Sequence, residues 1–563
     1  MSEATKDINN LNSLGVQPFY WRKGLDPKEG KHPGLRTNQT EIADGMEITW
    51  DVPVPMRDGV KIYADIFRPE GAKGELPVIL TMSPYGKHGP KTFAIFPGAG
   101  VPDGWVSKYA VWEGVDPITW TKKGYIVVNG DSRGSWGSEG NLEVFSKQES
   151  QDGHDLIEWL GTQSWSNGKV GMVGVSYLAI IQWGIAATKP PHLACFMPWE
   201  GFTDLYRDYS HHGGIPETKF MHFTMWSCRC GPNLVEDWIK NHEEHPLYDD
   251  YHRSKDKFET LANITAPVYA VIDWGDHGMH TRGCLNGWTG VRSKDKWLEI
   301  HGRKKWRYFF EEESVSRQEA FFKKYLKGEQ SEIDSFPRVR MEVRDRAWQG
   351  TFRGENEWPL ARTNYTKYYL DSGSMRLGPG GPQKTSVVSY ESTVQDSCAH
   401  FTHKFTKDTE LTGGMRLRLW VSTEKGDDMD LFVQLDKIGS DGKVAPFVAF
   451  SMVDDGPLGL GWLRVSHREL VINRSTTDRP WHPHTRRLLL RPDEVVPVDI
   501  EILPTSTLFR SGETLRVKIQ GNDCFRHSTP DVVQFHERTV NKGKHYIYTG
   551  PFYESYLVLP VID

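Results

Sequence analysis

Short apolar runs recur along the first 360 residues, and segments with helical periodicity separate most of them. The runs have the length of buried strands and are bounded by turn signals rich in Gly, Pro and Asn. They occupy residues 77–82, 124–129, 170–173, 266–273 and 297–300. Residues 46–67, with the turn Arg57-Asp58-Gly59, predict an antiparallel hairpin ahead of them. This alternation predicts a largely parallel α/β sheet, which binds ligands beyond the carboxyl ends of its strands.

The helical segments are less evenly distributed. Residues 152–160, 177–187 and 314–326 have the spacing of amphipathic or buried helices. Between 200 and 263 the strand pattern lapses into a polar, aromatic and His-rich stretch. We therefore expect residues 201–263 to form a helical cap inserted over the site.

The last third of the chain has a different pattern, with short strands, many turns and scarcely a helix. The strand candidates are residues 367–370, 415–422, 431–435, 498–502, 515–519 and 556–559. Such a series predicts an all-β sandwich or jelly roll. The expected organisation is an N-terminal arm over 1–45, an α/β domain over 46–200 and 264–360, the cap over 201–263, and a jelly-roll domain over 361–563.

Composition narrows the range of functions. A chain of 563 residues is long enough for several domains, and 38% hydrophobic with 25% charged residues is typical of a soluble globular protein. The formal charge of -6 lacks the excess of basic residues that is typical of nucleic-acid-binding proteins. No apolar run is long enough to span a membrane. Residues 1–10 are charged and no apolar stretch follows them, which predicts a cytoplasmic location. Six scattered cysteines lack paired metal-type spacing, which predicts reduced, structural thiols. Neither a metal nor another cofactor is expected.

Residues 166–179 are the strongest candidate for chemistry. An Asn-Gly turn leads into a short strand, then Gly174-Val175-Ser176, then a helix, which is the layout of a nucleophile elbow. A serine hydroxyl is a weak nucleophile until a base takes its proton, and the sharp turn would expose it beside the Tyr177 backbone N–H, where an oxyanion would form. Leu178 stands where the usual motif has its second glycine. A plain buried turn is the alternative interpretation.

The acid and the base should follow in the order Ser, Asp, His, each at the end of a later strand. Asp276 follows the strand at 266–273, and His301 follows the strand at 297–300. Asp273 is a rival acid, and His277 and His280 are rival bases. Those two histidines could also suggest a metal pair, but no third ligand is apparent in the sequence. The predicted triad is Ser176, Asp276 and His301.

Several motifs together resemble the cocaine esterase/NonD hydrolases and their X-Pro dipeptidyl-peptidase relatives. They are Ser83-Pro84-Tyr85, Asp131-x-Arg133-Gly134 with Ser138-x-Gly140, Gly174-x-Ser176-Tyr177 and Trp274-Gly275-Asp276. The resemblance implies an α/β-hydrolase domain, a helical cap and a jelly-roll third domain. It also implies that the Tyr85 hydroxyl joins the Tyr177 backbone N–H in binding the oxyanion. The family commonly carries Gly-Pro-Trp-x-His where this chain reads Gly302-Arg303-Lys304-Lys305-Trp306.

These features favour a serine hydrolase that cleaves a small-molecule carboxylic ester through an acyl-enzyme. One alternative is an X-Pro dipeptidyl-peptidase or other amide hydrolase, in which carboxylates between 200 and 244 would bind the substrate amine. A solvated face is the other interpretation of these carboxylates. Another is a non-catalytic protein whose β domain holds carbohydrate or a partner. The sequence leaves the substrate, the choice between ester and amide, and homo-oligomer formation open.

Overall fold

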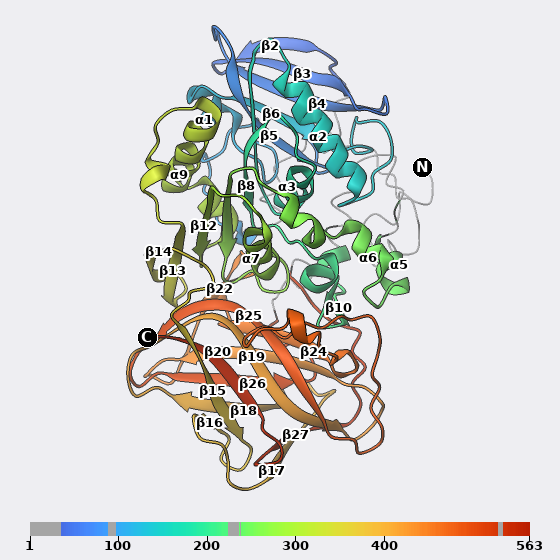
Figure 1. Cartoon of the computed structure of the whole chain (residues 1–563), viewed down its shortest axis with the longest axis vertical. Coiled ribbons are helices and arrows are strands. Elements are labelled where there is room, and N and C mark those ends of the chain that lie inside the picture. The colour runs from blue at the N-terminus through green and yellow to red at the C-terminus, as the bar shows by residue number, and fades with distance from the viewer. Residues whose placement is uncertain (1–34, 88–96, 223, 225–235, 237, 527–532) are drawn as a thin grey trace.

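The computed structural model describes residues 35–87, 97–222, 224, 236, 238–526 and 533–563. Figure 1 shows two parts stacked along the long axis of the molecule. The upper part is a sheet flanked by helices, and the lower part is built of strands.

The sheet of the upper part is mostly parallel, as the sequence predicts. Its strand order is β2-β3-β4-β6-β5-β7-β8-β11-β12-β13-β14, and the run from β6 to β13 is parallel throughout. The strands are β2 (Gln39–Ala43), β3 (Met46–Pro55), β4 (Lys61–Pro69), β5 (Leu76–Ser83), β6 (Ile126–Asp131), β7 (Ser166–Val175), β8 (Leu193–Trp199), β11 (Val268–Asp273), β12 (Lys296–His301), β13 (Val339–Arg346) and β14 (Gln349–Glu355). The five predicted runs and the hairpin are all strands here.

Helices cover both faces of this sheet, which explains why its strands read as continuous apolar runs. On β5, Val78 and Leu80 belong to one core, whereas Ile79 between them belongs to the other. Residues of α2 (Lys147–Gly161), α3 (Tyr177–Ala187) and α7 (Thr281–Gly290) pack in the first core. Residues of α1 (Pro117–Lys122), α8 (Lys305–Phe310) and α9 (Glu312–Phe322) pack in the second.

Two segments depart from the sequence-based expectation. The arm expected over 1–45 contains a strand, because β2 pairs with β3 from Gln39 to Ala43; residues 1–34 lie outside the described part. Strand β8 was not predicted, although it is fully paired between β7 and β11. It matters for the site because Glu200 follows it directly.

The segment expected to be the cap contains mainly short helical pieces. They are η6 (Tyr206–Ser210), α5 (Trp238–Glu244), α6 (Asp250–Lys255) and η7 (Phe258–Asn263), together with the two-residue strands β9 (His211–His212) and β10 (Ile215–Pro216). Part of this stretch lies outside the described residues, and its role as a cap stays a prediction. The helix expected over 314–326 is present as α9 and the following turn η8 (Lys323–Lys327).

The lower part is a set of mainly antiparallel strands around its own apolar core. Each of the six predicted runs lies within a strand, and the longest pairing joins β19 to β25. The strands are β15 (Thr363–Asp371), β16 (Arg376–Gly378), β17 (Ser386–Glu391), β18 (Cys398–Lys404), β19 (Thr409–Thr423), β20 (Asp430–Ile438), β21 (Val444–Ala445), β22 (Phe447–Ala449), β23 (Val453–Gly456), β24 (Gly459–Arg464), β25 (Val496–Phe509), β26 (Thr514–Gln520), β27 (Lys544–Thr549) and β28 (Tyr556–Ile562). The jelly-roll topology stays a prediction.

The two parts meet directly beside the strand ends of the sheet. The turn between β22 and β23 approaches Gly275, whose carbonyl accepts the Phe450 N–H at 2.9 Å. A Cβ at Gly275 would lie 2.0 Å from the Val448 carbonyl oxygen, so only glycine fits there. The C-terminal part therefore forms a wall next to the predicted acid, Asp276.

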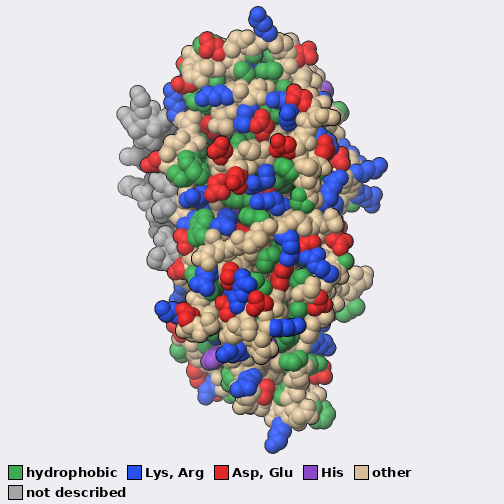
Figure 2. All heavy atoms as spheres, turned by 90° about the vertical axis from the view of Figure 1, so that its left-hand side faces the viewer, with side chains coloured by type: hydrophobic (Ala, Val, Ile, Leu, Met, Phe, Trp, Pro, Cys, Tyr) green, Lys and Arg blue, Asp and Glu red, His purple; other side chains and the backbone are tan. Residues whose placement is uncertain are grey.

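The molecular surface carries both signs of charge. Figure 2 shows Lys and Arg interspersed with Asp and Glu over the whole visible face. Among the described residues, no helix is both long and apolar enough to cross a membrane.

Candidate active site

Ser176 lies at a strained corner between β7 and α3. Its φ of 56° and ψ of -113° are unusual for a residue with a side chain. The corner needs small neighbours, because a Cβ at Gly174 would lie 2.5 Å from the Leu178 Cβ. The serine is only partly buried. This geometry is that of a nucleophile elbow, and Leu178 is accommodated by covering Gly174.

His280 is the histidine that contacts this serine. Its Nε2 lies 3.1 Å from the Ser176 Oγ and 3.9 Å from the Asp276 Oδ2. Asp276 and His280 are joined by one helical turn at the entrance to α7, where the His280 N–H donates to the Asp276 carbonyl at 3.2 Å. Burial and the nearby Lys305 ammonium lower the pKa of His280 to about 3, although Asp276 opposes this shift. The imidazole is therefore neutral at pH 7 and can accept the serine proton.

The structure does not bring His301 to Ser176. Its Nε2 lies 3.4 Å from the Glu200 Oε1, its Nδ1 accepts the Arg303 N–H at 3.1 Å, and its ring packs on Tyr308. In the sheet, β12 lies on the far side of β11 from β7. His301, at the end of β12, is buried against Glu200. The rival base His277 turns toward the C-terminal part instead, where its Nδ1 accepts the Leu460 N–H.

Three carboxyl groups, those of Asp276, Glu200 and Glu113, interact with the buried ammonium of Lys305. The Lys305 Nζ lies 3.1 Å from the Asp276 Oδ2 and 4.0 Å from the Glu200 Oε2. Burial raises the pKa of Glu200 well above its usual value, and burial raises that of Glu113 to about 8. Asp276 differs: burial would raise its pKa, but the nearby Lys305 ammonium brings it below its usual value. Of the three carboxyl groups, the surroundings thus favour the ionised form most at Asp276, whereas burial favours the neutral form at Glu113 and Glu200.

The rival acid Asp273 lies next to His301, with which it interacts electrostatically, and its own hydrogen bonds are to other groups. Its Oδ1 accepts the Gly275 N–H at 2.8 Å, and the Ser451 hydroxyl approaches its other oxygen at 3.5 Å. Burial raises the pKa of Asp273 well above its usual value. Its contacts with Gly275 and Ser451 suit a structural role at the contact between the two parts of the chain.

Tyr85 and Tyr177 lie together beside the serine, with ring centroids 5.5 Å apart. The Tyr177 hydroxyl donates to the Glu149 carboxyl at 2.9 Å, which anchors the start of α3. The segment that carries Tyr85 is tied to the end of β6, because the Lys87 N–H donates to Asp131 at 2.8 Å. The motif that carries Tyr85 therefore lies against the residue that follows the serine.

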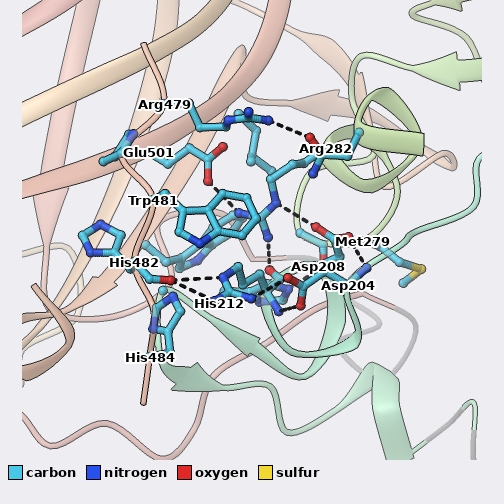
Figure 3. Close-up of a pocket in the computed structure, with 17 residues that line it drawn as sticks. Asp204, Asp208, His212, Met279, Arg282, Arg479, Trp481, His482, His484 and Glu501 are labelled. Atoms are coloured by element: carbon cyan, nitrogen blue, oxygen red, sulfur yellow. Dashed lines mark hydrogen bonds and ion pairs between the residues drawn. The ribbon is translucent and has the colours of Figure 1, made fainter. Parts of the chain in front are cut away.

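A separate polar cavity lies between the segment around η6 and the C-terminal part (Figure 3). Its volume is about 40 Å³, which suits water but not an ester substrate. Its charges are paired: Arg207 binds Asp204 at 2.6 Å, and Arg282 binds Asp208 at 2.7 Å. This cavity is part of the contact between the two parts of the chain. No cluster of His, Cys, Asp and Glu within the described ranges could hold a metal ion.

Comparison with known proteins places this geometry in a family. A model of the X-Pro dipeptidyl-peptidase (S15 family) matches residues 58–227, and one of the X-Pro dipeptidyl-peptidase C-terminal non-catalytic domain matches residues 331–558. The crystal structure of a CocE/NonD family hydrolase from Staphylococcus aureus is 41% identical, covers 92% of this chain and 94% of its own, and has a TM-score of 0.89. The chain belongs to the CocE/NonD family of hydrolases.

Other relatives of this CocE/NonD hydrolase agree with that assignment. Cocaine esterase from Rhodococcus sp. (strain MB1 Bresler) is 26% identical over 92% of this chain and the whole of that esterase. An α-amino acid ester hydrolase shares the fold, with a TM-score of 0.70 at 18% identity over 92% of this chain and 98% of that one. The protein is a serine hydrolase with an α/β-hydrolase domain and a C-terminal domain, and the family resemblance stated from its motifs is confirmed.

The CocE/NonD motif Gly-Pro-Trp-x-His ends at Trp306 in this chain when its glycine is placed on Gly302. Trp306 donates its Nε1–H to the Glu113 Oε1 at 3.1 Å, and its neighbour Lys305 binds Asp276. Trp306 thus stands at the place of the family histidine, and Trp306 and the neighbouring Lys305 both contact buried carboxyl groups. The sequence signal for His280 was its spacing of four from Asp276, because residues i and i+4 meet on one side of a helical turn.

Proposed function

We propose that this hydrolase cleaves a carboxylic ester through an acyl-enzyme on Ser176, with His280 as the general base. The observation that carries the proposal is the 3.1 Å contact between the Ser176 Oγ and the His280 Nε2 at a strained elbow. The sequence predicted His301 as the base; we propose instead that His301 packs against Glu200 and Tyr308. Asp276 remains the proposed acid.

In the first step the Ser176 hydroxyl gives its proton to the His280 Nε2 as the Oγ attacks the ester carbon. The oxyanion of the tetrahedral intermediate accepts hydrogen bonds from the Tyr177 backbone N–H and the Tyr85 hydroxyl. The imidazolium then returns the proton to the leaving alcohol, and water repeats the sequence to release the acid. Asp276 stabilises the imidazolium by its charge, since it lies 3.9 Å from the same nitrogen that carries the transferred proton.

Labelling with a fluorophosphonate tests the activated serine. We expect intact-protein mass spectrometry to detect one adduct, and peptide mapping to place it on Ser176, because only a serine with a bound base reacts readily. Denatured protein is the control and should stay unlabelled. An unlabelled native protein, or an adduct on another serine, would contradict the proposal.

The amide alternative derives from the S15 family match. A dipeptidyl-peptidase needs carboxylates that bind the substrate's free amine, and the sequence suggested residues 200–244 for this. Asp204 and Asp208 are paired with arginines, and Glu217 accepts the backbone N–H groups of 219, 220 and 221. Because these three carboxylates already have partners, they do not offer a binding site for a substrate amine. We therefore propose that an ester without a free amine is the better substrate.

We therefore expect kcat/KM for a simple aryl ester to exceed that for an X-Pro anilide by at least about 100-fold, since an unmatched amine would leave a charge unpaired on binding. The comparison uses steady-state rates at pH 7 with the same enzyme preparation. An N-acetylated X-Pro anilide is the control for the amine. Faster cleavage of the free X-Pro anilide would favour the peptidase.

A further inference from the structure

Glu113 is a buried carboxyl group beside the Tyr177 backbone N–H. It is 2% exposed and has a left-handed φ of 64°, which is costly for a residue with a side chain. Its carbonyl accepts the Val175 N–H at 3.0 Å, directly before the serine. The residue is thus fixed against the elbow by its backbone.

The two carboxyl oxygens of Glu113 differ in their surroundings. Oε1 accepts the Trp306 Nε1–H at 3.1 Å, whereas Oε2 has no hydrogen-bond partner of ordinary geometry within the described part of the chain. The Tyr177 backbone N–H interacts with this same carboxyl group. The Glu113 carboxyl group therefore lies beside the N–H that an oxyanion would use, and this position needs an explanation because a buried oxygen without a full hydrogen bond is costly.

We propose that Glu113 acts as a neutral carboxylic acid that donates its O–H to the oxyanion, as a third donor beside Tyr177 and Tyr85. This inference rests on the proposed function, because it assigns a role in the same tetrahedral intermediate. No atom is transferred: the acid keeps its proton and forms one hydrogen bond to the negative oxygen. A carboxylic acid can serve in this way only while it stays neutral at working pH.

The charges around Glu113 favour its neutral form. Burial raises its pKa to about 8, Glu200 after β8 raises it as well, and Lys305 and Trp306 from α8 and the Tyr177 N–H lower it. The Lys305 ammonium is shared among several carboxyl groups, because it lies 3.1 Å from Asp276 and 4.0 Å from Glu200. Its charge therefore does not act on Glu113 only. Above the pKa, a Glu113 carboxylate would face the oxyanion and oppose its formation.

The test is the pH dependence of kcat/KM for an aryl ester in wild type, Glu113→Gln and Glu113→Ala. We expect the wild-type value to fall about tenfold per pH unit above about pH 8. Glu113→Gln should keep activity within about tenfold at pH 7 and lose this alkaline limb, since its amide donates a hydrogen bond but cannot ionise. Glu113→Ala should lose about 100-fold at pH 7, as for removal of an oxyanion donor.

Tyr85→Phe is the matched comparison, because it should lower kcat at every pH and leave the alkaline limb in place. A limb that survives in Glu113→Gln with its midpoint unchanged would overturn the inference and point to another group. Lys257 is one candidate, since burial lowers its pKa to about 8. Should Glu113→Ala fail to fold by circular dichroism, the Gln variant decides alone.

Fluorophosphonate labelling separates this inference from the proposed function. If wild-type Ser176 does not label, the serine mechanism fails and the role of Glu113 fails with it. If Ser176 labels in both wild type and Glu113→Gln while the two pH profiles coincide, only the role of Glu113 is lost.

Discussion

Replacing His280 by glutamine should lower kcat by on the order of 10⁶-fold, as removal of the base does in other serine hydrolases. Glutamine fills similar space but cannot take the Ser176 proton, which the structure aims at the His280 Nε2 over 3.1 Å. The measurement is single-turnover hydrolysis of an aryl ester, together with the rate of fluorophosphonate labelling. Both should collapse together, because both need the activated serine.

His301→Gln is the matched control for this variant. His301 is also buried, and its contacts are to Glu200, Arg303 and Tyr308. We expect it to reduce activity less than about tenfold in the fraction that folds, since it touches no reacting atom. The reverse pattern, with His301→Gln inactive and His280→Gln active, would restore the base predicted from the sequence.

The fold was predictable because each central strand is buried on both faces and so forms an uninterrupted apolar run. Strand β8 was not predicted because prolines lie close to it and within it. Pro190 and Pro191 precede the strand, and Pro198 is part of it. Proline is typical of loops and strand edges, but β8 is paired on both sides. Tertiary packing overrides the local signal at this strand.

The proposed site could be located from the sequence where local geometry sets its residues. The elbow fixes Ser176 and Tyr177 through a turn of a few residues, and the end of β11 leads to Asp276. The spacing of four residues from Asp276 is a local signal for His280. It does not decide against His277 or His301, because the direction in which each side chain points across the sheet is not encoded locally. The buried group of Glu113, Glu200 and Lys305 was missed for the same reason, because segments nearly 200 residues apart assemble it.

Replacing Ser176 by glycine should abolish turnover and stabilise the hydrolase domain, whereas Ser176→Ala should abolish turnover alone. Both remove the nucleophile, with an expected loss in kcat on the order of 10⁶-fold. They differ in the backbone, because the φ of 56° at Ser176 is strained for alanine but costs glycine little. Such strain is worth about 1–3 kcal/mol, and the greater freedom of glycine in the unfolded chain offsets about 0.4–1 kcal/mol of it.

The net gain of about 1 kcal/mol should raise the melting temperature of the Gly variant above that of the Ala variant by about 2–4 °C. Differential scanning calorimetry of the two inactive proteins makes the comparison without any catalytic difference between them. Equal melting temperatures would mean that the elbow stores no strain. A higher value for glycine would mean that the chain gives up stability to hold the serine hydroxyl clear of the backbone, within reach of His280 and of an incoming carbonyl group.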